Sequence, residues 1–359
     1  MTYLKSLSLY NFRNYKKASI ELSPKINLFV GKNGQGKTNC LEAIALFISG
    51  KSFRSPLLKD LIMHGENEFF IKTHFVKNDI EQSLAIHYSP IQKKLTYNET
   101  SYSSFLPLIG VIQGVLFAGF FDELVKGSPQ IRRRFLDLQN AQIDPLYLHH
   151  LAHFQRALKE RNVLLRQKKW KTLDIYEELM SKSIPYLIEK RQRNLQDLEK
   201  SLKSIHSKLA NQEEPTELLY KTMFENNAEK CRELLEKNRF KDQKMGYTLI
   251  GPHKDEIEIN LKDKSAKKFG SEGQIQTLTT SIYLAEFKRL QRQIEEPPIF
   301  CIDDLGQNLD QGRLNRLLHF LQKMGQVFIT TPHAPNFAFD CDYKIFEIEE
   351  GKIKLPLKR

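Results

Sequence analysis

The chain has 359 residues, of which 40% are hydrophobic and 27% charged, and this composition excludes a disordered or fibrous protein. A chain of this length is expected to bury more than one core, while its longest apolar runs fall far short of the ~20 residues of a membrane helix. The formal net charge of +12 would attract polyanions, although a solvated lysine-rich surface accounts for it equally well.

The N-terminal part of the chain is predicted to be rich in β-strands. Alternating apolar residues predict strands over residues 3–9 and through Ile20 and Leu22, and a continuous apolar run predicts a third over residues 26–30. Residues 69–97 have the pattern of an antiparallel meander with breaks at 78–79 and 89–90. Because the chain opens on a strand, no secretory signal is predicted, and a cytoplasmic location without membrane contact is expected.

Residues 145–240 have a helical period. Apolar residues from Ile188 to Leu209 fall on heptad positions, which favours a helical lobe packed on itself over a long coiled coil, because the arms would reach only about 45 Å. Residues 151–210 hold 14 Lys and Arg against 7 Asp and Glu, so more than half of the net charge lies on this segment. From residue 248 on, strands and helices return, with buried parallel strands predicted over residues 299–302 and 327–329.

Residues 31–38 fit the phosphate-binding pattern G-x-x-x-x-G-K-[ST]. Glycines let backbone N–H groups curl around phosphates, Lys37 would reach the terminal phosphates, and Thr38 would offer its hydroxyl to Mg²⁺. A predicted strand precedes the segment and a predicted helix, residues 39–48, follows it, so the positive end of the helix dipole adds to the anion site. The predicted ATP-binding residues here are Gly31, Lys32, Asn33, Gly34, Gln35, Gly36, Lys37 and Thr38.

Two acidic residues follow the strand 299–302. Asp303 is predicted to hold Mg²⁺ together with Thr38, because parallel strands bring their carboxyl ends to one edge of a sheet. Asp304 would then orient or deprotonate the attacking water, which makes Lys37 and Asp304 the catalytic candidates. The alternative is an acidic turn with no role in chemistry.

A third segment distinguishes ABC-type machines from small-molecule kinases. Ser271, Gly273 and Gln274 open a predicted helix over residues 275–290. A serine and a glycine at a helix start present a hydroxyl and free N–H groups to an anion, although S-x-G-Q alone is usually just a helix cap. Between the phosphate loop and the acidic strand, this segment resembles the ABC signature, which contacts the γ-phosphate bound by a second protomer.

Stretches along nearly the whole chain resemble RecF, the family of bacterial recombination mediators. They are residues 7–15 (LSLYNFRNY), 50–54 (GKSFR), 125–129 (VKGSP) with 132–137 (RRRFLD), 251–255 (GPHKD) and 326–331 (QVFITT). The resemblance implies an α/β fold with an ABC-type ATPase head, built on a P-loop mixed sheet, and a helical second lobe. Residues 1–140 and 246–359 would form the ATP-binding head, and residues 141–245 the basic helical lobe.

The resemblance also implies a function. It predicts a homodimer that forms on ATP, binds double-stranded DNA near single-strand gaps and at junctions between single and double strands, and helps to load RecA. RecR and RecO-type mediators would be partners, and the process would be DNA repair and replication, including the SOS response to DNA damage. Weak DNA-dependent ATP hydrolysis, with Mg²⁺, would act as a switch.

Further candidates come from the positions that the resemblance places near the nucleotide. Arg13 and Asn14 are predicted to contact the base or ribose. Gln113 is a candidate for a Mg²⁺-sensing glutamine, the alternative being a loop residue without a role. Candidates for sensing the γ-phosphate lie at and just after the end of the strand 327–329: Thr330, Thr331 and His333.

Basic residues of the helical lobe are the DNA candidates. Arg166, Lys168 and Lys169 are predicted to contact DNA phosphates, the alternative being a solvated face. The arginines 132–134 would either bind phosphate or pair with nearby acids. No role is predicted for His253.

Three features depart from the RecF pattern. Residues 119–121 (Gly-Phe-Phe) replace an acidic turn, Gln307 stands where serine is usual, and Glu272 occupies a signature position that often holds glycine. The main alternative function is the ATP-binding subunit of an ABC transporter, which would not need excess basic charge on the helical lobe. A small-molecule kinase would need no signature segment, and a long-armed chromosome tether is excluded by arm length.

Overall fold

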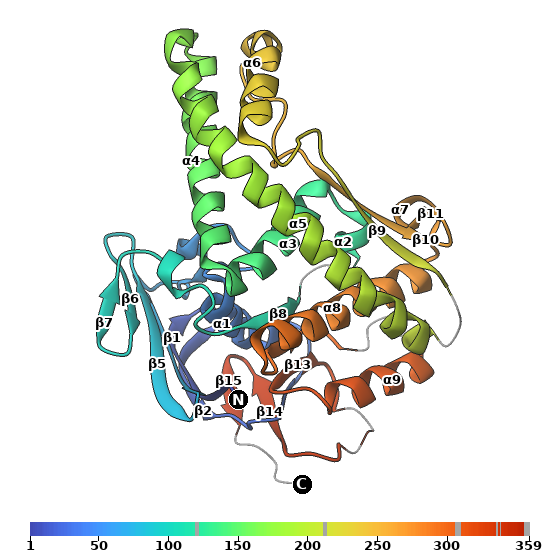
Figure 1. Cartoon of the computed structure of the whole chain (residues 1–359). Coiled ribbons are helices and arrows are strands. Elements are labelled where there is room, and N and C mark those ends of the chain that lie inside the picture. The colour runs from blue at the N-terminus through green and yellow to red at the C-terminus, as the bar shows by residue number, and fades with distance from the viewer. Residues whose placement is uncertain (119–121, 211–213, 306–309, 335–336, 338, 355–359) are drawn as a thin grey trace. The chain divides into compact units, whose positions relative to one another are not determined.

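The computed structural model describes residues 1–118, 122–210, 214–305, 310–334, 337 and 339–354. The chain divides into two compact units (Figure 1): unit 1 comprises residues 1–121, 208–211 and 276–359, and unit 2 comprises residues 122–207 and 212–275. The predicted helical lobe spans residues 141–245, so unit 2 extends it to include residues 122–140 and 246–275. Every described helix is too short or too polar to cross a bilayer.

Unit 1 contains two six-stranded sheets. One has the strand order β2-β1-β4-β5-β6-β7 and the other the order β15-β14-β3-β13-β12-β8. The strands of the first are β1 (Tyr3–Phe12), β2 (Tyr15–Glu21), β4 (Phe69–Lys77), β5 (Ile80–Tyr88), β6 (Lys93–Tyr97) and β7 (Thr100–Tyr102). Those of the second are β3 (Ile26–Val30), β8 (Gly114–Phe117), β12 (Ile299–Ile302), β13 (Val327–Thr331), β14 (Tyr343–Glu349) and β15 (Lys352–Lys354).

The second sheet is the one that positions the site. Strand β3 pairs in parallel with β13, and β13 pairs in parallel with β12. The carboxyl ends of all three strands therefore lie at the same edge of the sheet. All residues of β12 and β13 are buried, as predicted for parallel strands covered on both faces. The predicted strands over residues 3–9 and 26–30 and the antiparallel meander are likewise confirmed.

Helix α1 (Lys37–Ser49) is buried on nearly every side. Its apolar residues share one core with β1 and β4 of the first sheet and with β3, β12 and β13 of the second. A helix that is apolar all round must be enclosed in this way. The helix that follows the phosphate loop is therefore fixed in the centre of unit 1. The described part of this unit also contains α9 (Gln311–Leu321), the main part of α8 (Glu272–Ile294) and two short 3₁₀ helices, η1 (Leu58–Leu61) and η2 (Leu106–Leu108).

Unit 2 is built on long helices and a small sheet. Its helices are α2 (Glu123–Lys126), α3 (Pro129–Ile143), α4 (Pro145–Arg166), α5 (Leu173–Ala210, mostly in this unit), α6 (Ala228–Met245) and α7 (Ala266–Phe269). The sheet has the order β11-β10-β9, with β9 (Thr216–Lys221), β10 (Glu256–Leu261) and β11 (Lys264–Ser265). The predicted heptad face of α5 is buried from Ile188 to Leu209. Strand β9 corrects the expectation that residues 145–240 are helical throughout.

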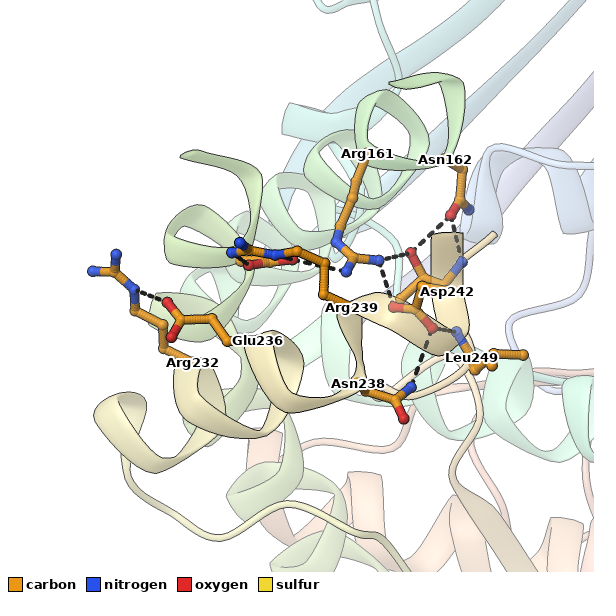
Figure 2. A network of polar contacts seen from close by, with 10 residues as sticks. Arg161, Asn162, Arg232, Glu236, Asn238, Arg239, Asp242 and Leu249 are labelled. Carbon is orange, nitrogen blue, oxygen red and sulfur yellow. Dashed lines mark hydrogen bonds and ion pairs between the residues drawn. The ribbon is translucent and has the colours of Figure 1, made fainter. Parts of the chain in front are cut away.

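A buried ion cluster holds three helices of unit 2 together (Figure 2). The Arg161 guanidinium, fully buried on α4, lies 2.8 Å from Glu177 of α5 and 2.8 Å from Asp242 of α6. It also donates to the Thr248 hydroxyl at 2.7 Å, and Arg239 donates to Glu177 from the other side. Two guanidinium groups thus balance two carboxylates; Arg161, Glu177 and Asp242 are fully buried, while the Arg239 side chain is 32% exposed.

This cluster makes unit 2 sensitive to one side chain. We expect Arg161→Met to lower the free energy of unfolding by about 3–5 kcal/mol, because Glu177 and Asp242 would stay buried with half of their positive partners gone. The control is Arg232→Met on the same helix as Asp242, which removes only a half-exposed pair with Glu236 and should cost about 0–1 kcal/mol. Urea denaturation of both variants measures the difference, and similar midpoints would contradict the argument.

A second buried arginine gives residues 251–255 a structural role. Arg191 of α5 pairs with Asp137 through two 2.9 Å bonds and donates to the Pro252 carbonyl at 2.7 Å. His253 lies nearby, 3.2 Å from the Thr248 carbonyl, and burial lowers its pKa to about 4, so it packs as a neutral ring. These contacts join residues on both sides of the predicted lobe to α5. Unit 2 therefore includes residues that the prediction left outside the lobe.

Two of the three arginines at 132–134 bond other groups of unit 2. Arg132 is buried and pairs with Glu256 at 2.6 Å, while Arg133 donates to the Asp255 carbonyl at 2.6 Å. Arg134 is exposed. Two of these side chains are therefore committed to the fold of unit 2.

Candidate nucleotide-binding site

The loop between β3 and α1 has the geometry of an anion site. Gly34 and Gly36 adopt φ values of +81° and +119°, which residues with a Cβ rarely reach. Helix α1 begins at Lys37 with no side chain capping it and no acid in its first turn. The Asn39 and Cys40 N–H groups of that turn donate to the Gly36 carbonyl, so the N–H groups of Lys37 and Thr38 are the ones that remain for an anion, which the helix dipole also favours.

Lys37 is held at the mouth of this loop by the loop itself. Its Nζ donates to the carbonyl oxygens of Gly31 at 2.7 Å and Lys32 at 3.0 Å, and the residue is only 4% exposed. An ammonium group has three donors. Two hold the side chain in position, which leaves one N–H for a phosphate oxygen.

The predicted metal residues meet at the edge of the second sheet. The Thr38 hydroxyl donates to Asp303 at 3.0 Å, and the Thr330 hydroxyl donates to the same oxygen at 2.5 Å. Burial raises the pKa of the Asp303 carboxyl, and the charge of Asp304 raises it further, while the Thr330 bond opposes the rise. A cation at this position would stabilise the ionised form of Asp303.

Asp304 follows in a strained backbone conformation. Its φ is +51°, in the left-handed region, and its N–H donates to the Thr330 hydroxyl at 2.7 Å. Of the predicted γ-phosphate sensors, Thr330 orders both acids, and the Thr331 hydroxyl donates to the His333 carbonyl at 2.9 Å.

Asn14 and Tyr15 brace the phosphate loop from the turn between β1 and β2. The Asn14 amide donates to the Gln35 carbonyl at 2.9 Å, and the Tyr15 hydroxyl donates to the Gly36 carbonyl at 3.0 Å. From the other side, Gly351 N–H donates to the Gln35 carbonyl at 3.0 Å. The loop is therefore preorganised by two segments far apart in the sequence.

Arg13 lies beneath this loop, with its guanidinium engaged by protein groups. It makes two 2.8 Å bonds to the buried Glu42 of α1 and donates to the Asp60 carbonyl at 2.9 Å. These contacts fix α1 against the β1–β2 turn. A direct contact of Arg13 with the base or ribose stays a prediction.

Two residues near the site, Asn39 and Arg54, were not among the predicted site residues. Arg54 donates to the side-chain Oδ1 of Asn39 at 2.9 Å, and the Asn39 side-chain amide donates to the Oδ1 of Asn14 at 2.8 Å. The charge of Arg54 opposes the rise that burial causes in the pKa of Asp303. The signal was present in the sequence, because residues 50–54 are one of the stretches that resemble RecF.

Gln113 lies at the other end of the sheet from Asp303. Strand β8 pairs in parallel with β12, with Gly114 opposite Ile299 and Phe117 opposite Ile302. Four residues of strand, roughly 13 Å, separate Gln113 from the metal edge. This placement argues against a Mg²⁺-sensing role. Residues 119–121 and Gln307 lie outside the described residues.

The signature segment forms a helix cap in unit 2. Ser271 N–H donates to the Gln274 side-chain oxygen at 3.0 Å, and Gln274 N–H donates to the Ser271 hydroxyl at 3.3 Å. This reciprocal pair is a capping box. The Gln274 amide also donates to the buried Glu214 at 2.8 Å, so its side chain positions Ser271 and is occupied within its own chain.

The segment 125–129 is joined to the signature segment by polar contacts. Lys126 of residues 125–129 pairs with Glu272, the residue that departs from the ABC pattern. Lys267 donates to the Gly127 carbonyl at 3.2 Å. Glu272 is therefore used to join the start of α8 to the segment 125–129 within unit 2.

Comparison with known proteins decides the family. The AAA ATPase domain model matches residues 2–162. DNA replication and repair protein RecF from Protochlamydia amoebophila is 40% identical over 96% of this chain and 98% of its own length. The chain belongs to the RecF family. RecF from Chlamydia caviae, 32% identical over 98% of this chain and 97% of its own length, is a second such relative.

Solved structures agree with this RecF assignment. The recombination mediator protein RecF with ATP, of the RecFOR pathway, superposes with a TM-score of 0.90 at 28% identity, over 99% of this chain and 98% of that one. The Smc head domain from Pyrococcus furiosus shares the fold, with a TM-score of 0.58 at 19% identity, over 99% and 96% of the two chains. The predicted α/β ABC-type ATPase head is confirmed, and the transporter alternative is not favoured.

Proposed function

We propose that this RecF-family chain binds ATP with Mg²⁺ and uses it to control binding to DNA. The observation that carries the proposal is the assembled site of unit 1, where an uncapped helix start, Lys37, Thr38 and Asp303 converge. The solved RecF bound to ATP, which covers nearly all of this chain, supports the same ligand. The surplus of basic residues over 151–210 supports a polyanionic partner.

The residues present fit a magnesium ion. Mg²⁺ prefers oxygen ligands and usually takes one or two protein groups together with nucleotide phosphates. Thr38 and Asp303 supply a hydroxyl and a carboxylate 3.0 Å apart. The ion would neutralise phosphate charge, while Lys37 binds the β- and γ-phosphates and Asp304 orients the attacking water.

The finer proposal is an ATP-closed homodimer that clamps duplex DNA. In it, Ser271 and Gly273 of one protomer complete the nucleotide site of the other, and slow ATP hydrolysis releases the clamp. The preferred DNA would be the junction between single and double strands at a gap. RecR and RecO-type mediators would act with this protein in loading RecA, in keeping with the RecFOR pathway of the solved relative.

The test compares DNA binding with ATP, ADP and no nucleotide, at two salt concentrations. We expect tight duplex binding with ATP only, and a steep loss of affinity as salt rises, because phosphate contacts release counterions. Equal binding in all three nucleotide states would contradict nucleotide control.

The dimer can be tested through Ser271. We expect Ser271→Arg to keep ATP binding by the monomer, because the phosphate loop of unit 1 is unchanged, but to block ATP-dependent dimerisation. Sedimentation of Ser271→Arg, of Lys37→Ala and of their mixture measures this. The mixed dimer retains one intact composite site, so association that appears only in the mixture supports the trans arrangement.

A serine that only caps α8 predicts a different outcome. Loss of the cap would cost about 0.5–2 kcal/mol of stability and would leave dimerisation intact. Ser271→Arg that dimerises with ATP like the parent would therefore reject the signature assignment.

A further inference from the structure

The free end of the long helices in unit 2 forms a distinct surface. We call it the hairpin tip and define it as residues 166–172, which link α4 to α5, together with residues 240–247 at the end of α6. The two segments meet, because a Cβ added to Gly246 would lie 4.0 Å from the Arg166 side chain. Arg161, about one helical turn before Arg166 on α4, bonds Asp242 of α6 and so joins the same two helices (Figures 1 and 2).

Large apolar side chains are exposed at the hairpin tip. Trp170 is 45% exposed, Phe240 65%, Met245 55% and Tyr247 39%. The same helices bury Phe154, Leu173 and Leu235, so the unit has a core that these side chains do not join. Exposed aromatic groups that gather on one surface indicate a binding site.

The charge of the hairpin tip is one-sided. Residues 166–172 contain four basic and no acidic residues, and all four are exposed: Arg166, Lys168, Lys169 and Lys171. On α6, Lys241 and Lys244 are exposed, while Asp242 is buried against Arg161. The Lys244 ammonium lies 4.5 Å from the centre of the Phe240 ring. A cation and an exposed aromatic ring are therefore side by side.

We propose that the hairpin tip binds unpaired, single-stranded DNA, with bases stacked on Trp170 and Phe240 and phosphates on the surrounding lysines. The proposal rests on the proposed function, which makes DNA the polyanionic partner. In a duplex the faces of the bases are covered by their neighbours, so ring stacking requires unpaired bases. A tip of this kind would distinguish a strand junction from uniform duplex.

Trp170 provides a direct readout, because it is the single tryptophan of the chain. In the full-length protein, we expect oligothymidylate and a duplex with a single-stranded tail to quench its fluorescence. Blunt duplex should quench it much less. Heparin is the matched control, because it supplies polyanionic charge without bases. Equal quenching by heparin and oligothymidylate would show a general polyanion surface and overturn the stacking proposal.

Variants separate stacking from charge. We expect Trp170→Ala or Phe240→Ala to weaken binding of labelled tailed DNA by about 5- to 100-fold, with the salt slope and blunt-duplex affinity unchanged. Trp170→Phe should restore most of the loss. Met223→Ala, which removes a 69% exposed side chain outside the tip, is the control. The triple change of Arg166, Lys168 and Lys169 to Ala should lower the salt slope by about one unit per lost contact.

The outcomes for this surface and for the proposed function are distinct. ATP-dependent binding of blunt duplex, without quenching of Trp170 by oligothymidylate, would overturn the hairpin-tip proposal and leave the proposed function standing. No DNA binding in any nucleotide state would reject both. Aromatic variants with the parent's affinity for tailed DNA would assign the tip to a different partner, such as an acidic protein.

Discussion

Lys37→Ala should abolish ATP binding and, with it, every ATP-dependent property of the protein. The ammonium is the fixed positive charge of the phosphate loop, held in place by the carbonyls of Gly31 and Lys32. Hydrogen bonds between an ionised donor and phosphate are about twice as strong as neutral ones. Removing this group leaves the backbone N–H groups and the dipole of α1 as the remaining attraction.

Calorimetric titration with Mg²⁺ and ATP measures this loss. The control is Lys17→Ala, because Lys17 is an exposed lysine of β2 that lies outside the phosphate loop. We expect the control to bind ATP within a few-fold of the parent. Undiminished affinity in Lys37→Ala would reject the assignment of residues 31–38 as the phosphate loop.

The core of the site was predictable because its chemistry is local in sequence. The phosphate loop needs glycines at φ values that other residues avoid, and a lysine and a threonine at the start of the next helix, so eight consecutive residues contain the signal. Asp303 was predictable for a different reason. A fully apolar run that ends in acids identifies a buried strand, and parallel strands place their ends together.

The supporting contacts were not predictable because they depend on register. Arg54, Asn39 and Asn14 form a chain of hydrogen bonds that reaches the phosphate loop, but they lie 15 and 25 residues apart in sequence. The position of Gln113 also depends on how the strands pair. The sequence did not reveal that β8 runs parallel to β12, and that pairing places residues before β8 at the wrong edge of the sheet.

Strand β9 was not predicted, because its sequence and its neighbours in the chain do not indicate a strand. The segment Thr216–Lys221 alternates buried and exposed positions only in part, and it lies between two long helical stretches. Its pairing with β10, whose burial alternates regularly, is what makes it a strand. Tertiary pairing overrode the local pattern here.

Asp304→Asn should trap the ATP-bound state. Asp304 is the acid placed to orient or deprotonate the attacking water, and its backbone is anchored through Thr330 rather than through its side chain. Asparagine accepts the left-handed φ of +51° as readily as aspartate does, so the change removes the charge and preserves the turn. Alanine would strain the same position and confuse folding with chemistry.

Loss of a positioned general base typically slows a reaction by about 10²–10⁴-fold, and we expect ATP turnover on DNA to fall within that range. ATP affinity should stay near the parent value, because Lys37, Thr38 and Asp303 are unchanged. Single-turnover hydrolysis and the lifetime of the ATP-bound complex on duplex DNA give the two readouts. A variant that binds ATP and hydrolyses it at the parent rate would move the water-activating role away from Asp304. A variant that loses ATP binding altogether would instead place this carboxylate among the groups that hold the nucleotide and its metal.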